Sequence, residues 1–153
     1  MLSKRPIGTL LLFLIITSCG GSGKGESANN NAANLTNKER QYFSNGRGLY
    51  ELHCASCHME EGQGLGLLIP PLKNADYLMK NVAGAARVIK YGLKDPIAVN
   101  GQIYEQPMPA HADLTPLEIA EILTFVSNSW GNAHGGVTVE EVKEALTSGK
   151  PAN

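Results

Sequence analysis

Hydrophobic side chains recur at helical spacing along much of the chain, whereas alternating patterns typical of strands are short. Thr36-Asn37-Lys38-Glu39 is a capping box, in which the threonine hydroxyl and the glutamate carboxylate each bind a free backbone N–H group. It predicts a helix that runs into Cys54. A further helix is predicted from about Val82 to Tyr91, with Gly92 as its C-terminal cap. The apolar positions of the first helix are Tyr42, Phe43, Leu49 and Tyr50.

The second half of the chain predicts two more helices and one hairpin. Thr115-Pro116-Leu117-Glu118 is again a capping box, with proline at the first helical position. Another helix is predicted from Thr138, with Glu141 three residues on, to Gly149. Asn100-Gly101 between two short segments predicts a small hairpin. The helix after Thr115 has a one-sided apolar stripe, formed by Ile119, Ile122, Leu123, Val126 and Trp130.

These elements indicate an all-α fold with a modest core. We find no internal repeat, no βαβ alternation and no phosphate-binding loop. A large planar apolar cofactor would add the buried area that such a small set of helices lacks.

The first residues have the anatomy of an export signal. Lys4 and Arg5 precede an apolar run at 7–16, which is shorter than the about 20 residues that span a bilayer. The run leads into Ile16-Thr17-Ser18-Cys19, which resembles a bacterial lipoprotein signal whose cysteine becomes the lipid-bearing N-terminus. An ordinary secretory signal with an incidental Cys19 is the alternative. Both interpretations place the mature protein outside the cytoplasm.

The composition after the signal predicts a linker and one folded domain. Residues 20–34 contain no branched aliphatic or aromatic side chain, so they cannot build a core. The expected organisation is a signal peptide at 1–18, a lipidated cysteine plus flexible linker at 19–35, and one domain at 36–153. The net charge is −1, or −3 without the two basic residues of the signal. Without a basic face, no nucleic-acid partner is expected.

One motif indicates specific chemistry: Cys54-Ala55-Ser56-Cys57-His58. Two thiols three positions apart can each add to a vinyl group of one haem, and the adjoining histidine can bind the iron. C-x-x-C-H is the sequence of c-type haem attachment. Since this attachment takes place outside the cytoplasm, the motif agrees with the export signal.

Three other interpretations of the motif compete with haem. A zinc site needs four ligands, but no cysteine follows Cys57 and only His111 and His134 remain downstream of His58. A thioredoxin-like redox pair belongs in a βαβ setting, which the pattern lacks. A structural disulfide is compatible with an exported protein, but it leaves the adjoining histidine unexplained.

From about Thr36 to its end the sequence resembles the class I cytochrome c family. In that family a glycine eight residues before the first cysteine and an aromatic residue four before it pack the first helix against the C-terminal one. Gly46 and Tyr50 occupy these positions, and the family's glycine-rich loop corresponds to Glu61-Gly62-Gln63-Gly64. The resemblance implies a cytochrome c-like helical domain wrapped around one covalently attached haem c. The helix after Thr138 is extra to it.

The resemblance also assigns roles around the haem. Pro70 corresponds to the proline whose carbonyl accepts the Nδ1 proton of the axial histidine, a bond that fixes the ring tautomer. Met108-Pro109 corresponds to the methionine loop, and 114–130 to the C-terminal helix. Tyr104 is a further candidate contact of the cofactor. Met59 is a departure, because the family often has glycine at this position.

The sixth ligand of the iron has several candidates. Met59 and His53 adjoin the attachment sequence and cannot cross the ring, and Met79 has apolar neighbours typical of core packing. The preferred candidate, Met108, is bracketed by prolines that stiffen the loop and disfavour helix. The main rival is His111, and His134 completes the set.

With His58 and Met108 on the iron, the expected function is single-electron transfer rather than catalysis. The alternative is a small-ligand sensor or a peroxidase-like enzyme with an open sixth site, and a third interpretation is a fixed subunit of a larger complex. The segment 92–132 is most similar to monohaem domains beside membrane oxidases, nitrite reductases and quinoprotein dehydrogenases. Redox proteins of these classes are therefore the expected partners, together with the membrane that holds the lipid anchor.

Overall fold

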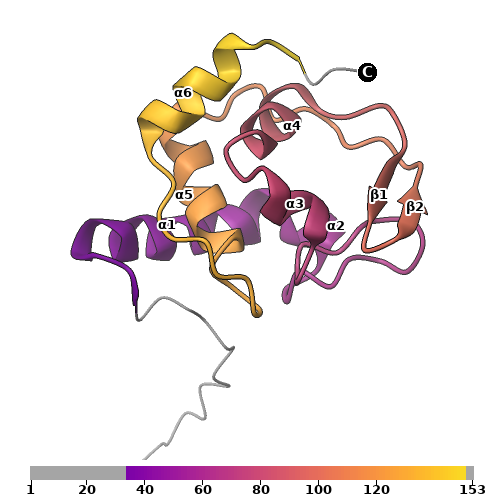
Figure 1. The fold of residues 1–153 in the computed structure, drawn as a ribbon, viewed down its shortest axis with the longest axis horizontal. Coiled ribbons are helices and arrows are strands. Elements are labelled where there is room, and N and C mark those ends of the chain that lie inside the picture. The colour runs from indigo at the N-terminus through magenta and orange to yellow at the C-terminus, as the bar shows by residue number, and fades with distance from the viewer. Residues whose placement is uncertain (1–33, 151–153) are drawn as a thin grey trace, which may run out of the picture.

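The computed structural model describes residues 34–150, and the expected signal peptide, Cys19 and most of the linker lie outside this range. Figure 1 shows helices packed against one another, with a two-stranded hairpin at one end of the molecule. The elements in chain order are α1 (Asn37–His53), α2 (Ala55–His58), α3 (Asp76–Lys80), α4 (Ala85–Tyr91), β1 (Ile97–Val99), β2 (Gln102–Tyr104), α5 (Pro116–Val126) and α6 (Val139–Thr147).

Capping boxes begin the three longest helices, as the sequence predicts. At the start of α1 the Thr36 hydroxyl accepts from the Glu39 N–H group and the Glu39 carboxylate accepts from the Thr36 N–H group. The same pair of bonds begins α5 at Thr115 and α6 at Thr138. Each box satisfies two donors that the first turn of a helix leaves free. The starts of these helices are therefore fixed by local sequence.

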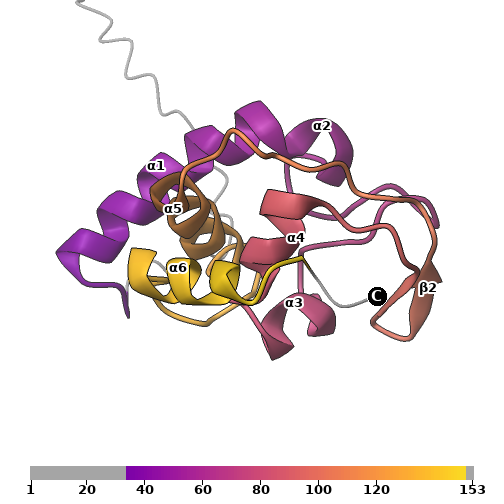
Figure 2. The same cartoon turned by 90° about the horizontal axis from the view of Figure 1, so that it is seen from above.

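The centre of the fold is the crossing of α1 and α5, where Gly46 lies against the backbone of α5. Aromatic rings surround this crossing, with centroids 5.1 Å apart for Phe43 and Phe125 and 5.2 Å apart for Tyr50 and Trp130. Figure 2 shows α5 lying between α1 and α6. This packing confirms the expected role of Gly46 and Tyr50 in joining the first helix to α5.

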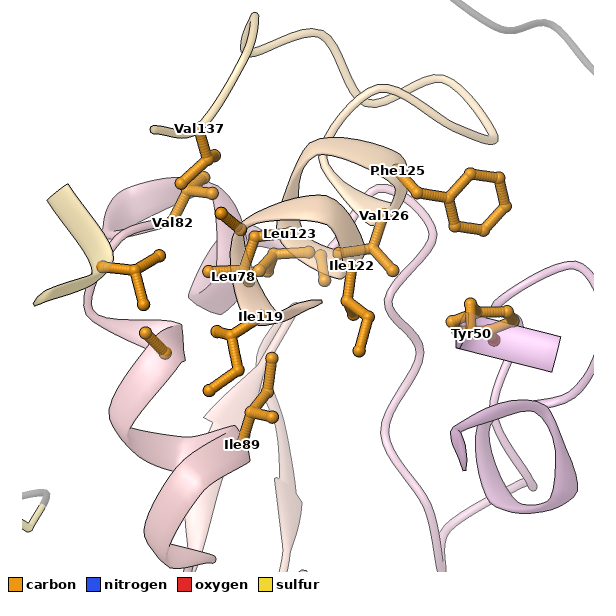
Figure 3. Close-up of a cluster of buried hydrophobic side chains, with 14 of the residues drawn as sticks. Tyr50, Leu78, Val82, Ile89, Ile119, Ile122, Leu123, Phe125, Val126 and Val137 are labelled. Atoms are coloured by element: carbon orange, nitrogen blue, oxygen red, sulfur yellow. The ribbon is translucent and has the colours of Figure 1, made fainter. Parts of the chain in front are cut away.

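The buried core extends from α5 toward α3 and α4. All eight residues of α5 from Ile119 to Val126 are buried, so the helix is covered on more than the single stripe that the sequence indicates. In Figure 3, Ile122 and Leu123 point among side chains from α3, α4 and the segment before α6. The labelled members of this cluster are Tyr50, Leu78, Val82, Ile89, Ile119, Ile122, Leu123, Phe125, Val126 and Val137.

The predicted hairpin is present, with Ile97 opposite Tyr104 and Val99 opposite Gln102 in an antiparallel pair. Asn100 and Gly101 have φ values of 51° and 80°, the left-handed backbone that a two-residue turn of this kind requires. In Figures 1 and 2 the hairpin lies at the end of the molecule opposite the start of α1.

Several predicted boundaries were wrong by a few residues. The helix predicted from Val82 begins at Ala85, because the Asn81 side chain accepts from the Gly84 N–H group and residues 82–84 form a turn. The helix predicted to reach Trp130 ends at Val126, and Trp130 has a left-handed φ of 55°. Helix α3 was not predicted.

The start of the folded part also differs from the expected boundary at residue 36. Leu35, assigned to the linker, is only 4% exposed and therefore belongs to the packed domain. Among residues 34–150, no helix combines the length and hydropathy of a membrane span.

Candidate haem site

The attachment motif lies at the junction of α1 and α2. α1 ends at His53, and the Cys54 N–H group still bonds to the Tyr50 carbonyl over 2.8 Å. The N–H groups of Cys57 and His58 both bond to the Cys54 carbonyl, at 3.1 and 2.9 Å. This tight turn brings both thiols and the imidazole to the lining of one cavity.

The two cysteines differ in their environment. Cys54 is partly buried and Cys57 is exposed, and both thiols are free. Burial, together with the nearby Cys57, raises the pKa of the Cys54 thiol to about 12. Before a haem is attached, Cys54 is therefore a neutral thiol at physiological pH.

His58 is 8% exposed and is held by the loop that follows it. Its Nδ1 atom lies 3.0 Å from the carbonyl oxygen of Pro70, the contact expected from the family resemblance. A carbonyl can only accept a hydrogen bond, so Nδ1 carries the proton and Nε2 keeps its lone pair. Burial lowers the pKa of His58, which the Pro70 bond partly opposes, and the neutral ring is the form that binds a metal.

Pro70 is positioned by a loop with no room for a side chain at Gly62 or Gly64. A Cβ on Gly64 would lie 2.3 Å from the Ile69 carbonyl oxygen, and Gly64 has a φ of 70°. The Gly64 N–H group bonds to the His58 carbonyl over 3.1 Å, and the Leu72 N–H group bonds to the Gly62 carbonyl over 2.7 Å. The glycine-rich loop therefore ties Pro70 to the histidine that it orients.

Met108 reaches the same cavity from a distant segment of the chain. It forms a β-bridge with Leu93, in which its N–H group bonds to the Leu93 carbonyl at 2.8 Å and its carbonyl accepts at 3.0 Å. Gly92 is needed beside it, because a Cβ there would lie 2.7 Å from the Met108 carbonyl oxygen. With Pro107 and Pro109 on either side, the backbone of Met108 is held rigidly.

The cavity and its open mouth together span about 1260 Å³ of space between atoms. Both thiols, His58, Pro70, Tyr104 and Met108 line it. A haem is a planar apolar ring with two vinyl groups and an iron, and thiols, an imidazole and a thioether around an apolar space are the groups that hold it. The remaining wall is mostly apolar and includes Ile69, Leu72, Ala75, Leu78, Val88, Ile89, Leu93, Ile97, Val99, Ile122, Leu123 and Val126.

The other candidates for the sixth ligand do not line the cavity. Met79 is partly buried and packs against the core. His111 lies beside His53, with ring centroids 6.0 Å apart, and His134 is exposed after α5. Met59 is the C-cap of α2. Within residues 34–150, no group of three or more acidic, histidine or cysteine side chains is placed to hold a metal ion.

Sequence reasoning missed some of the residues around the site. Asp95 and Gln106 are polar members of the cavity wall, and Leu93 fixes Met108 through the β-bridge. No local signal identifies them, because a single bridge between positions 15 apart, outside the β1–β2 hairpin, leaves no periodic pattern. Proline beside Asp95 and Gln106 is the only hint that these segments are extended.

Comparisons with known proteins agree with this geometry. Residues 43–130 match the family model described as cytochrome c. Cytochrome c-552 of Thermus thermophilus is 36% identical over 100 residues, which cover 60% of this chain and 76% of that protein. The cytochrome c subunit of the quinone alcohol dehydrogenase of Gluconobacter oxydans (strain 621H) is 30% identical over 111 residues, or 71% of this chain and 23% of that protein.

The fructose dehydrogenase cytochrome subunit of Gluconobacter japonicus is 32% identical over 115 residues, covering 70% of this chain and 23% of that protein. These matches agree with the arrangement of helices around one apolar cavity and with the C-x-x-C-H motif on its wall. The chain belongs to the cytochrome c family as a class I c-type cytochrome, an electron-transfer protein with covalently bound haem c.

Proposed function

We propose that this protein is a membrane-tethered monohaem electron carrier with histidine and methionine as axial ligands. Cys54 and Cys57 attach the haem, His58 and Met108 bind its iron, and Pro70 orients His58. The observation that carries this proposal is that two thiols, an imidazole and a thioether line one apolar cavity. Tyr104, buried at the end of β2, is proposed as a further contact of the haem.

The haem supplies the one-electron chemistry of its iron, and the chain sets the conditions for it. His58 is kept in one tautomer by the Pro70 carbonyl, and Met108 is kept in place by two backbone bonds to Leu93. With His58 and Met108 both bound to the iron, no position would be left for a substrate. The apolar wall disfavours the more charged ferric state, and a thioether does the same, so the reduction potential is raised.

Optical spectroscopy of the purified protein tests the carrier function. We expect a reduced spectrum with sharp bands, a pyridine haemochrome typical of haem c, and no reaction of the ferrous protein with carbon monoxide at neutral pH. Ready binding of carbon monoxide would show an open sixth site. The proposed function would then be that of a sensor or an enzyme and not of an electron carrier.

Replacing both cysteines tests the attachment. Cys54→Ala/Cys57→Ala should lose all haem that survives denaturing electrophoresis, and it should be largely unfolded because the haem fills the core. Each single variant should keep part of the covalent haem. Covalent haem at the wild-type level in the double variant would contradict the assignment.

We further propose that the partner is a membrane oxidase, reductase or dehydrogenase. The support is that some of the similar proteins are named as cytochrome subunits of dehydrogenases. The loop between Gly64 and Pro70 exposes Leu65, Leu67 and Leu68 at 49%, 72% and 59%. An apolar loop beside the haem cavity favours small, transient contacts, below about 1,200 Å².

The borders of this contact surface are proposed from the resemblance as Ala55, Ser56, Met59, Leu65 and Ala110, whereas Gly64, also expected there, is buried. Glu61 nearby is partly neutralised by Lys73, at 3.9 Å. We therefore expect the rate of electron transfer to a partner to change only moderately with ionic strength. A many-fold fall in rate between low and physiological salt would show a charged contact surface instead.

The tether is proposed from the sequence alone, as a signal peptide at 1–18, lipid on Cys19 and a linker up to the folded domain. Stable anchoring needs two or more acyl chains, which lipoprotein modification supplies. Cys19→Ser should move the protein out of the membrane fraction, or leave it unprocessed, without changing the haem spectrum. An intact mass that fits an unmodified N-terminus elsewhere would contradict the anchor.

A further inference from the structure

Two histidines lie together outside the haem cavity, at the end of α1 and in the loop after Met108. The imidazole rings of His53 and His111 have centroids 6.0 Å apart and planes at 75°. Neither ring lines the cavity, and both are partly exposed. Within the described part of the chain, neither ring has a hydrogen-bond partner. Their ring nitrogens are therefore free to bind a ligand.

The backbone under each ring is fixed, although the rings themselves can turn. His53 is the last residue of a 17-residue helix. The N–H group of His111 bonds to the Ile89 carbonyl over 2.9 Å, and its own carbonyl accepts from Leu114 at 3.2 Å. The two Cα positions are thus set by the fold. The proximity of the rings is a built feature that does not depend on a mobile terminus.

Their separation fits the coordination of one ion. With a metal–nitrogen bond of about 2.0–2.1 Å, an ion lies about 3.2 Å from the centroid of each imidazole. Two rings on one ion then have centroids about 5.2 Å apart at a tetrahedral angle and about 6.4 Å apart at a linear one. The observed 6.0 Å lies between these limits. The rings now lie edge to face, so they must turn about their side-chain bonds for a nitrogen of each to reach one ion.

We propose that His53 and His111 form a binding site for a divalent transition-metal ion of the zinc or copper class. Imidazole nitrogens suit these ions. Because no third acidic, histidine or cysteine ligand is placed with them among residues 34–150, water fills the remaining positions. Such a site exchanges its ion with solution, unlike a closed structural zinc site.

The charges around the pair are mixed, because the Lys90 ammonium donates to the carbonyls of Ala112 and Leu114 beside His111. Glu118, at the start of α5, is close enough to His53 for the histidine to contribute to the lowered pKa of its carboxyl group. Burial, and then the proximity of His53, lower the pKa of His111. The buried His58 also interacts electrostatically with His111, but its Nδ1 is engaged by Pro70.

A bound ion would join two segments that are 58 positions apart, since His53 precedes the attachment motif and His111 follows the methionine loop. It would bind the folded state and not the unfolded one, so it would raise the stability of the folded protein. It would also stiffen the loop of Met108 against α1.

Calorimetric titration of the holocytochrome with zinc chloride at pH 7.5 tests the site. We expect one zinc ion per protein, with affinity reduced at least tenfold in both His53→Ala and His111→Ala. His134→Ala is the matched control, because His134 is exposed and distant in sequence from both, and it should bind as the wild type does. Saturating zinc should raise the melting temperature of the wild type and of His134→Ala only.

The spectrum of each variant shows whether the haem environment is intact, so a loss of zinc binding is not confused with unfolding. Binding should weaken as the pH falls, because protons compete for the ring nitrogens. Absence of zinc binding to the wild type, or equal binding by both histidine variants and the wild type, would overturn the site.

Discussion

Gly46 of α1 faces the carbonyl group of Glu121 in α5 with no room between them. A Cβ at Gly46 would lie 1.9 Å from the Glu121 oxygen and 2.4 Å from its carbonyl carbon. Because these are backbone atoms in the buried part of α5, from Ile119 to Val126, they cannot yield as a flexible side chain would. The crossing of the two longest helices therefore requires glycine, which has no Cβ, at position 46.

Gly46→Ala should destabilise the holoprotein by about 3 kcal/mol or more, since the helices must separate to admit the new carbon. Gly48 is the matched control in the same helix, because a Cβ there meets nothing within 4 Å. Gly48→Ala should gain about 0.5–1 kcal/mol from helix propensity alone. Urea unfolding followed by circular dichroism measures both, and equal stabilities for the two variants would contradict the close approach.

Tyr50 and Met59 are joined across the attachment motif. The Tyr50 hydroxyl donates to the Met59 carbonyl over 2.6 Å, while Met59 has φ 65° and ψ 164°. This is backbone geometry that only glycine adopts without strain. The family resemblance already marks this position, where glycine is frequent, as a departure.

Met59→Gly should raise the free energy of unfolding by about 1 kcal/mol. The relief of strain, about 1–3 kcal/mol, is partly offset by the greater entropy of glycine in the unfolded chain. Met59→Ala is the control, because it removes the thioether and keeps the Cβ that causes the strain. It should show no gain, and a gain of equal size in both variants would assign the effect to the side chain and not to the backbone.

The features that could be predicted from sequence are local ones. Thr36, Thr115 and Thr138 each begin a helix because the capping partner lies three residues away in the chain. Asn100-Gly101 specifies its turn through the backbone preferences of two adjacent residues. Cys54, Cys57 and His58 carry their chemistry within five positions. In each case the interaction that decides the structure lies inside a short window.

The features that were missed depend on residues far apart. Trp130 continues the apolar spacing of α5, yet the helix stops at Val126 and the indole packs against Gly62 instead. The bridge between Leu93 and Met108, and the meeting of His53 with His111, arise only when separate segments come together. No periodicity along the chain encodes such contacts.

The capping boxes predict a specific response to acid. The backbone and side chain of Thr115 lower the pKa of Glu118 from its ordinary value of 4.5. A carboxyl group with a lowered pKa in the folded state contributes stability that is present above about pH 4.5 and is lost as the pH falls through the folded value. Glu118→Gln keeps a side chain that suits the box and removes the titration.

Glu118→Gln should therefore lose less stability than the wild type between pH 6 and pH 3, measured by urea unfolding at each pH. Glu144→Gln is the control, because Glu144 is exposed inside α6 and its side chain caps no helix. Its pH profile should follow the wild type. Independently, Thr115→Ala should cost about 1 kcal/mol at pH 7 through loss of the cap.

The identity of the sixth ligand decides between an electron carrier and a haem protein with an open iron. If Met108 binds the iron, the ferric protein should show the weak charge-transfer absorption of sulfur–iron ligation at the red end of the spectrum. Met108→Ala should lose this band, bind carbon monoxide in the ferrous state and have a lower reduction potential, because the ligand that favours ferrous iron is gone. Spectroscopy and potentiometric titration measure these changes.

Two variants separate this ligand from its competitors. Met79→Ala should keep the band, because Met79 lies outside the cavity wall. It should lower the free energy of unfolding by at most about 2–5 kcal/mol, because the side chain packs against the core. His111→Ala should also keep the band and the potential, because His111 lies beside His53 and not in the cavity. In the reverse result, His111→Ala would allow carbon monoxide to bind the iron and Met108→Ala would leave the spectrum unchanged. The loop after Met108 would then have to move toward the haem. The protein would be a bis-histidine carrier of lower reduction potential.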